Sequence, residues 1–168
     1  MIVVSPLSGI AAAASRWTPR TMLTLMSTSE PVEPPPCVET HMALTFNDVV
    51  DVAAAARGLR PPASEHVAAI IDLARDAERP LLIHCWFGVS RSPAAALIAA
   101  AALQPQRSER ELTDELRALA PYATPNARMI ALADEALGRG GRLAEAVAAI
   151  GRGAETAEGV PFAWDIGA

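Results

Sequence analysis

A thiol, a guanidinium and two hydroxyl side chains lie close together between His84 and Ser92. The residues before them, 80–83, form an apolar run that predicts a buried strand, and the alanine-rich run 93–103 predicts a buried helix. A tight turn into a helix directs unpaired backbone N–H groups and the positive end of the helix dipole at one point. The sequence therefore predicts a phosphate- or sulfate-binding loop at the carboxyl end of a strand.

Each residue type in this loop suits that chemistry. Gly88 permits backbone angles that a side chain forbids, which helps the turn to close around an anion. Arg91 supplies a planar fork that holds two phosphate oxygens at once. Cys85 lies at the base of the loop, where the field that attracts a dianion also favours the nucleophilic thiolate. The candidate phosphate-binding residues are Trp86, Phe87, Gly88, Val89, Ser90 and Arg91.

The run His-Cys-x-x-Gly-x-Ser-Arg-Ser, with five residues between Cys85 and Arg91, resembles the signature of the cysteine-based protein tyrosine phosphatases. The small dual-specificity branch is the nearest likeness. The resemblance implies that Cys85 is the nucleophile, that Arg91 clamps the phosphate and that Ser92 stabilises the thiolate as a leaving group. It also implies that His84 orients the loop and that no metal or cofactor is needed. The alternative is a buried cysteine beside a solvated arginine.

Phosphoryl transfer from an ester also needs a proton for the departing oxygen, which a carboxylic acid supplies. Related phosphatases carry an aspartate for this step on a loop after a strand. Asp48 directly follows the strand predicted at 41–46 and fits this place best, and Asp51 is the second candidate. Aspartate also caps turns readily, so a structural role is the alternative for both.

Two further residues have both a functional and a structural interpretation. Asn126 follows Pro125, a pair that in the resembled family opens a helix and supports the phosphate loop; a plain helix start is the alternative. Cys37 is a candidate for a reversible disulfide with Cys85, although a small packed residue is the favoured interpretation.

Composition narrows the partners and the compartment. The chain has 168 residues and a formal net charge of −5, which argues against nucleic acid or an anionic membrane as the main ligand. Two cysteines make no disulfide framework, so we expect a reducing cytoplasm. The longest apolar run, 94–103, is too short to cross a bilayer.

The order of elements predicts an α/β fold: one three-layer domain with a central, mostly parallel sheet of about four strands flanked by helices. The domain is expected over residues 1–153 and an irregular tail over 154–168, with no role assigned to Trp164. On the helix predicted at 63–77, His66 is expected at the surface. The stretch 52–62 is expected to be a lid, a pocket wall or a surface insertion. Strands are predicted at 2–4, 22–26, 41–46 and 80–83, and helices at 63–77, 93–103, 108–119, 128–137 and 143–150.

The side chains of the loop also bear on the substrate. Trp86, Phe87 and Val89 are uncharged, whereas inositol-phosphate members of the resembled superfamily tend to carry basic residues there. The sequence thus favours a protein tyrosine or dual-specificity phosphatase that acts on phosphorylated proteins. The alternatives are a small-metabolite or inositol-phosphate phosphatase and a non-catalytic phosphate-binding module. A sulfur-transfer enzyme ranks lower, because His84 and the Ser90–Ser92 run fit phosphatases better.

Overall fold

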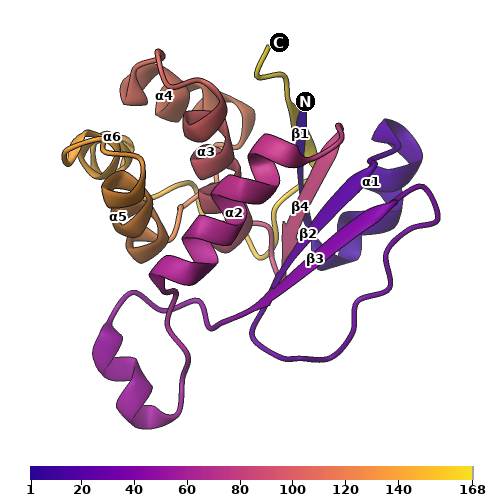
Figure 1. The fold of residues 1–168 in the computed structure, drawn as a ribbon, viewed down its shortest axis with the longest axis horizontal. Helices are drawn as coiled ribbons and strands as arrows, with labels where there is room; N and C mark the ends of the chain where they lie inside the picture. Colours follow the sequence, from indigo (N-terminus) through magenta and orange to yellow (C-terminus); the bar gives the residue numbers. More distant parts are fainter. Residues whose placement is uncertain (168) are drawn as a thin grey trace.

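A computed structural model describes residues 1–167 and contains one central sheet (Figure 1). The sheet has five strands in the order β3-β2-β4-β1-β5. The first four are parallel to one another, and β5 is antiparallel to β1. The strands are β1 (Ile2–Pro6), β2 (Thr21–Met26), β3 (Thr40–Thr45), β4 (Leu81–Cys85) and β5 (Phe162–Trp164).

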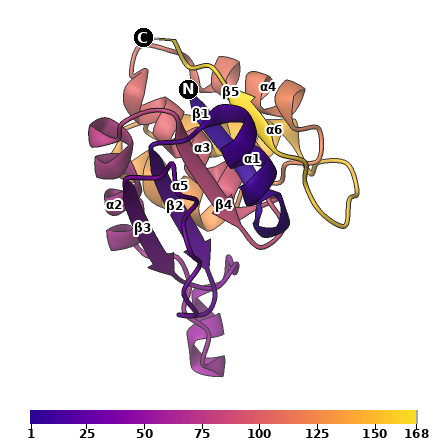
Figure 2. The same cartoon turned by 90° about the vertical axis from the view of Figure 1, so that its right-hand side faces the viewer.

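Helices cover both faces of the sheet, as the α/β prediction requires (Figures 1 and 2). One face packs against α1, and α2 to α6 lie on the other side of the sheet, where α3 contacts β1 and β4. A short 3-10 helix precedes α1, and a second one, η2, lies in the loop after β3. The helices are η1 (Leu7–Gly9), α1 (Ile10–Trp17), η2 (Val52–Arg57), α2 (Ser64–Asp76), α3 (Arg91–Leu103), α4 (Glu109–Leu119), α5 (Ala127–Ala136) and α6 (Arg142–Ile150).

Alternation along the strands divides the core into two clusters. In β4, Ile83 and Cys85 face the larger cluster with α2 and α3, whereas Leu82 faces α1. In β1, Val4 faces the larger cluster and Val3 faces α1. Successive side chains of a strand point to opposite faces, so a strand that is buried on both sides is apolar throughout. Cys85 therefore ends its strand on the face that α3 covers.

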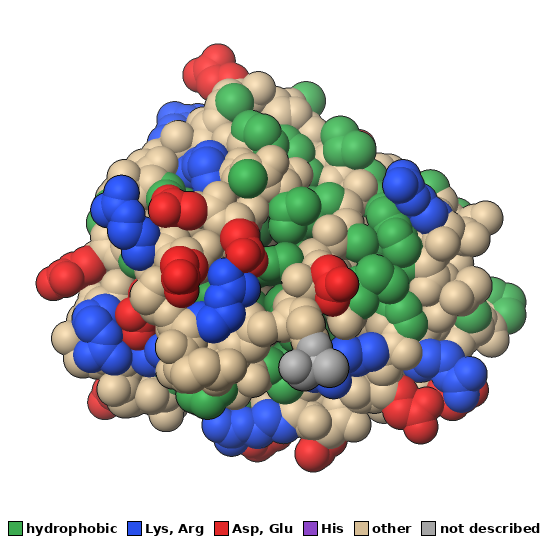
Figure 3. All heavy atoms as spheres, turned by 90° about the horizontal axis from the view of Figure 1, so that it is seen from above, with side chains coloured by type: hydrophobic (Ala, Val, Ile, Leu, Met, Phe, Trp, Pro, Cys, Tyr) green, Lys and Arg blue, Asp and Glu red, His purple; other side chains and the backbone are tan. Residues whose placement is uncertain are grey.

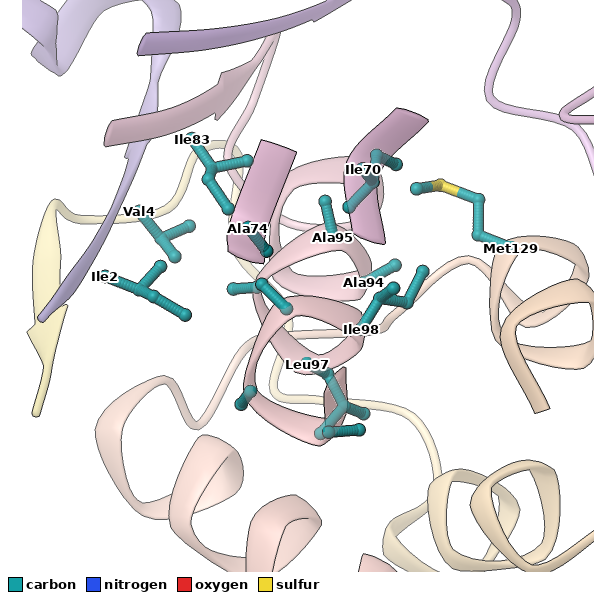
Figure 4. Packing of buried hydrophobic residues seen from close by; sticks show 14 of the residues in the cluster. Ile2, Val4, Ile70, Ala74, Ile83, Ala94, Ala95, Leu97, Ile98 and Met129 are labelled. Carbon is teal, nitrogen blue, oxygen red and sulfur yellow. The ribbon is translucent and has the colours of Figure 1, made fainter. Parts of the chain in front are cut away.

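Helix α3 lies at the centre of the larger cluster and is buried on nearly every side. Figure 4 shows Leu97 and Ile98 of α3, with Ile70 of α2 and Met129 of α5 nearby. The small alanines of α3 allow close approach of the neighbouring elements, and burial of each large aliphatic side chain contributes about 1.5–3 kcal/mol. A helix held this firmly fixes the position of its first residue, Arg91.

The strand register gathers the predicted site residues at one edge of the sheet. Cys85 is level with Pro6, and His84 is level with Thr24. The loops after β1, β2, β3 and β4 therefore all leave the sheet at this edge. In open α/β sheets ligands bind at the carboxyl ends of the parallel strands.

The end of the chain contains structure that the sequence did not predict. Residues 162–164 form β5, a fifth strand beyond the four expected, so the segment after Gly153 is not irregular throughout. Trp164 is 2% exposed, and its indole Nε1 donates a hydrogen bond to Glu115. The last strand is thus attached both to the sheet and to α4.

The prediction that His66 lies at the surface was wrong. Its side chain is buried, and its ring centroid lies 4.7 Å from that of Phe46. Its Nδ1 accepts a hydrogen bond from the amide of Ala63 at the start of α2. A histidine in the first turn that caps its own helix satisfies a free N–H group while its ring packs inward.

Cys37 and Cys85 lie at opposite ends of the sheet. Thr21 of β2 pairs with both Thr40 of β3 and Leu81 of β4, so Thr40 and Leu81 are at the same height in the sheet. Cys85 lies four residues beyond Leu81, about 13 Å along the strand direction, and two strands away from Thr40, about 10 Å across the sheet. Cys37 precedes Thr40 at the far end, and Val38 packs on the α1 face. The Cα atoms of a disulfide lie within about 7 Å of each other, so this geometry rules out the bridge.

No helix in residues 1–167 is long and apolar enough to cross a membrane. Viewed from above, acidic and basic side chains are interspersed on the surface (Figure 3).

Candidate active site

The loop between β4 and α3 pairs its carbonyl groups and leaves its amide groups free. No backbone carbonyl of residues 1–167 accepts a hydrogen bond from the amides of residues 86–90. The loop carbonyls, in contrast, accept hydrogen bonds from neighbouring backbone amides at Trp86, Phe87, Val89 and Ser90. Free donors beside the amino end of a thirteen-residue helix are an arrangement that suits an anion.

Gly88 is required in this loop for two reasons. Its φ is +67°, in the left-handed region that side chains disfavour. A Cβ atom at this position would also lie 2.8 Å from the backbone nitrogen of Pro6. The loop therefore packs directly against the end of β1, and any side chain here would push it away.

Cys85 lies at the floor of a pocket of about 230 Å³. Its side chain is 2% exposed, and its Sγ lies 3.2 Å from the hydroxyl Oγ of Ser92 in the first turn of α3. A hydroxyl at this distance can donate to a thiolate and so stabilise its charge. Asp48, Phe87 and Arg91 line the same pocket.

The Nη1 of Arg91 is anchored by hydrogen bonds, whereas its Nε has none within the described part of the chain. Its Nη1 donates hydrogen bonds to the hydroxyl of Ser27 and to the carbonyl oxygen of Phe46, both at 3.0 Å. Its Nε is buried and has no hydrogen-bond partner among residues 1–167. A buried donor without a partner costs about 1–3 kcal/mol, which an anion in the pocket would recover. The residues present thus fit a phosphate group.

Asp48 is held in the same pocket by Ser90, in the loop between β4 and α3, and by Asn126 at the start of α5. Its Oδ1 accepts hydrogen bonds from the Ser90 hydroxyl at 2.8 Å and from the Asn126 side-chain amide at 2.7 Å. Its Oδ2 lies 3.9 Å from the Nε of Arg91. Asp51 instead accepts a hydrogen bond from the amide of Ala53 and caps η2. Of the two predicted candidates, the fold brings only Asp48 to Cys85.

Asn126 joins three parts of the site. Its side-chain oxygen accepts hydrogen bonds from the amides of Arg128 and Met129, both at 3.1 Å, and so caps α5. Its own amide donates to the carbonyl oxygen of Ser90, while its side-chain amide holds Asp48. Both interpretations of this residue, helix cap and loop support, describe contacts that are present.

His84 lies behind the loop and is completely buried. Its Nε2 is 2.7 Å from the hydroxyl of Thr24, which is in turn 2.8 Å from Nε2 of His41. Burial is the main cause that lowers the pKa of His84 to about 4. The ring is therefore neutral at neutral pH, as suits a residue that orients the loop.

The low pKa of His84 predicts a pH-dependent loss of stability. The unfolded state, with an ordinary pKa of 6.5, binds a proton that the folded state excludes down to about pH 4. The free energy of unfolding should thus fall by about 3 kcal/mol more in the parent than in His84→Asn as the pH drops from 6.5 to 4. Urea titrations at several pH values measure this difference, and parallel curves for the two proteins would contradict it.

Several residues of the site carry no signal in the sequence. Ser27 and Phe46 anchor Arg91 from the loop after β2 and the end of β3. Thr156 and Ala157, from the segment after α6, line the pocket with Cys85. These residues meet only because the topology brings distant loops to one edge of the sheet.

No protein-family model matches this chain, and no curated protein sequence matches it. Its fold is similar to the crystal structure of DUSP15, with a TM-score of 0.60, 13% identity and coverage of 88% of this chain and 90% of that chain. It is also similar to a mouse putative dual specificity phosphatase complexed with zinc tungstate, with a TM-score of 0.55, 19% identity and coverage of 87% and 86%. A human tyrosine phosphatase-like serine/threonine/tyrosine-interacting protein is similar with a TM-score of 0.55, 12% identity and coverage of 82% and 91%.

These likenesses extend over most of the chain. The resemblance seen in the loop from His84 to Ser92 is therefore matched by the architecture around it. The chain has the fold of the dual-specificity phosphatases.

Proposed function

We propose that this protein is a protein tyrosine or dual-specificity phosphatase that hydrolyses phosphomonoesters through a phosphocysteine intermediate. One observation carries the proposal: a buried thiol, a guanidinium with an unpartnered Nε and a carboxyl group line one pocket. These groups belong to Cys85, Arg91 and Asp48. A nucleophile, an anion clamp and a proton donor are the three parts that this reaction needs.

The first step transfers the phosphoryl group to sulfur. The phosphate binds to the loop amides and Arg91, and the Cys85 thiolate forms the S–P bond while the ester O–P bond breaks. The Asp48 carboxyl group gives its proton to the departing oxygen. Positioning and charge stabilisation supply most of the rate, and covalent capture divides the transfer into two easier steps.

The second step releases phosphate. Water attacks phosphorus, Asp48 takes a proton from it, and the S–P bond breaks. The sulfur leaves as a thiolate, and the Ser92 hydroxyl 3.2 Å away stabilises its charge. Because the loop and Arg91 provide the positive field, hydrolysis of phenyl phosphate is expected in the presence of a metal chelator.

Replacing Asp48 by asparagine tests the proton donor. Asparagine keeps the shape of the side chain and an oxygen that accepts hydrogen bonds, but its amide is not acidic enough to protonate the departing oxygen. We expect kcat for phenyl phosphate to fall about 10²-fold or more. The loss should be smaller for 4-nitrophenyl phosphate, because nitrophenolate leaves readily without a proton. Steady-state kinetics on both esters measure the difference.

Asp51→Asn is the matched control, since this aspartate lies three residues away and caps η2. It should keep the kcat of the parent on both esters. Equal losses in the two variants, or a loss in Asp48→Asn that is the same for both esters, would contradict the assignment of Asp48 as the acid.

A non-catalytic phosphate-binding module is the second candidate. This candidate is retained because one of the similar folds belongs to a protein described as tyrosine phosphatase-like and as an interacting protein. Such a module would bind inorganic phosphate in the pocket and show no hydrolysis of any ester. A small-metabolite or inositol-phosphate phosphatase would hydrolyse those compounds in preference to phosphotyrosine peptides, so a substrate panel separates the three functions.

A further inference from the structure

The segment between α6 and β5 returns to the candidate active site. We call residues 152–160 the C-terminal strap; in Figure 2 it is the yellow loop that leads to β5. Its Gly159 amide donates a hydrogen bond of 2.8 Å to the carbonyl oxygen of Phe87 in the phosphate loop. Thr156 and Ala157 line the same pocket as Cys85. The strap is therefore part of the pocket wall.

Tyr122 holds the strap in place. Its hydroxyl donates a hydrogen bond to the carbonyl oxygen of Val160 at 2.6 Å and accepts one from the amide of the same residue at 2.9 Å. A Cβ atom on Gly159 would lie 2.7 Å from the Tyr122 ring and 2.9 Å from the Gly88 carbonyl oxygen. The strap thus packs tightly between this ring and the phosphate loop.

Two more contacts hold the beginning of the strap against the turn after α4. The Ala154 amide donates to the carbonyl oxygen of Pro121, and the Gly153 amide donates to the hydroxyl of Thr124. Near the other end, the Ser8 hydroxyl donates to the carboxylate of Glu158. A segment tied at both ends presents a wall of fixed shape rather than a mobile lid.

The chemistry of the wall differs from that of the floor. The charged and polar groups that suit a phosphate, Arg91 and the loop amides, lie beside Cys85. The strap contributes Ala157 and Thr156 to the lining, and the loop between β4 and α3 contributes Phe87, which is 60% exposed. The wall is therefore suited to contact the group that carries the phosphate.

The size of the pocket agrees with an aromatic group there. Its volume is about 230 Å³. A cavity of about 150 Å³ is enough to hold benzene, so the pocket has room for a phenyl ring in addition to a phosphate. A flat ring beside Phe87 gains aromatic stacking, which a serine phosphate cannot obtain.

We propose that Ala157 and Thr156 of the C-terminal strap determine substrate specificity by forming, opposite Phe87, the slot that receives the ring of an aryl phosphate. This inference rests on the proposed function, because it assigns a binding site to the aryl group whose oxygen leaves phosphorus when Cys85 attacks. It makes phosphotyrosine the preferred substrate and the alkyl phosphates of serine and threonine poorer ones.

Ala157→Leu tests the slot, because Ala157 is exposed and a larger side chain there fills the pocket without disturbing the core. We expect KM for phenyl phosphate to rise at least tenfold, with little change in kcat. The inhibition constant of inorganic phosphate should stay within twofold, since that ion occupies only the floor. Ala154→Leu, an exposed alanine of the same strap outside the pocket, should leave both constants unchanged.

Direct binding of phenyl phosphate and of inorganic phosphate, measured by calorimetry, separates this inference from the proposed function. If the parent hydrolyses phenyl phosphate but Ala157→Leu changes neither KM nor binding, the slot is refuted and the phosphatase stands. If the parent shows no hydrolysis, selective weakening of phenyl phosphate binding in Ala157→Leu still supports the slot. If Ala157→Leu weakens the binding of phenyl phosphate and inorganic phosphate equally, or of neither, the slot is refuted.

Discussion

Replacing Cys85 by serine is expected to lower kcat for phenyl phosphate by about 10⁴-fold or more. The change exchanges sulfur, a strong nucleophile, for a hydroxyl oxygen, which is a much weaker one. The ring of loop amides and Arg91 remain in place, so binding of inorganic phosphate should persist. Single-turnover kinetics and calorimetry of phosphate binding measure the two effects separately.

Cys37→Ser provides the matched control for this substitution. Cys37 is the other cysteine of the chain and lies at the opposite end of the sheet from the pocket. The control should retain the activity of the parent within twofold. An acid-stable phosphoenzyme should form in Cys37→Ser and be absent from Cys85→Ser; labelling in both variants would show that the nucleophile lies elsewhere.

The phosphate loop is the part of the site that the sequence predicts best, because its residues are contiguous. Strand, turn and helix follow one another between Leu81 and Leu103, and a short segment of this kind sets its own geometry. The free amides, the left-handed Gly88 and the contact between Cys85 and Ser92 all lie within it. Local sequence therefore determined local structure.

The groups that complete the site come from distant parts of the chain, and this is why they were missed. The side chain of Arg91 meets that of Ser27, 64 residues earlier, and the carbonyl of Phe46, 45 residues earlier. Those contacts exist because β2 lies between β3 and β4 in the sheet. Strand order depends on how whole elements pack, and no sequence motif near Ser27 indicates that it contacts Arg91.

The end of the chain illustrates a second limit. Strand β5 has three residues, too few to show the alternation by which strands are recognised. The glycines and charged residues of the C-terminal strap indicate a loop, which is correct, but its position over the phosphate loop depends on Tyr122 and on the pairing of β5 with β1. Tertiary contacts give this loop its place.

Arg91→Lys is expected to lower kcat/KM for phenyl phosphate by about 10³-fold. The guanidinium is held on one side, where its Nη1 bonds to Ser27 and the Phe46 carbonyl, while its buried Nε lies 3.9 Å from the Asp48 carboxylate without a hydrogen-bond partner among the described residues. A lysine ammonium is a single point charge and cannot keep both anchors while it grips two phosphate oxygens. The positive charge is kept, so a large loss would show that geometry matters beyond charge.

Two comparisons make this result interpretable. Arg110→Lys alters an arginine whose side chain is 80% exposed and should leave kcat/KM unchanged. Ser27→Ala removes one anchor of the guanidinium without touching a bound phosphate. We therefore expect kcat/KM to fall about tenfold or less, because Arg91 is then positioned less accurately. If Arg91→Lys retained most of the parent's activity, a positive charge alone would suffice. The planar guanidinium of Arg91 would then make no specific contribution to transition-state binding.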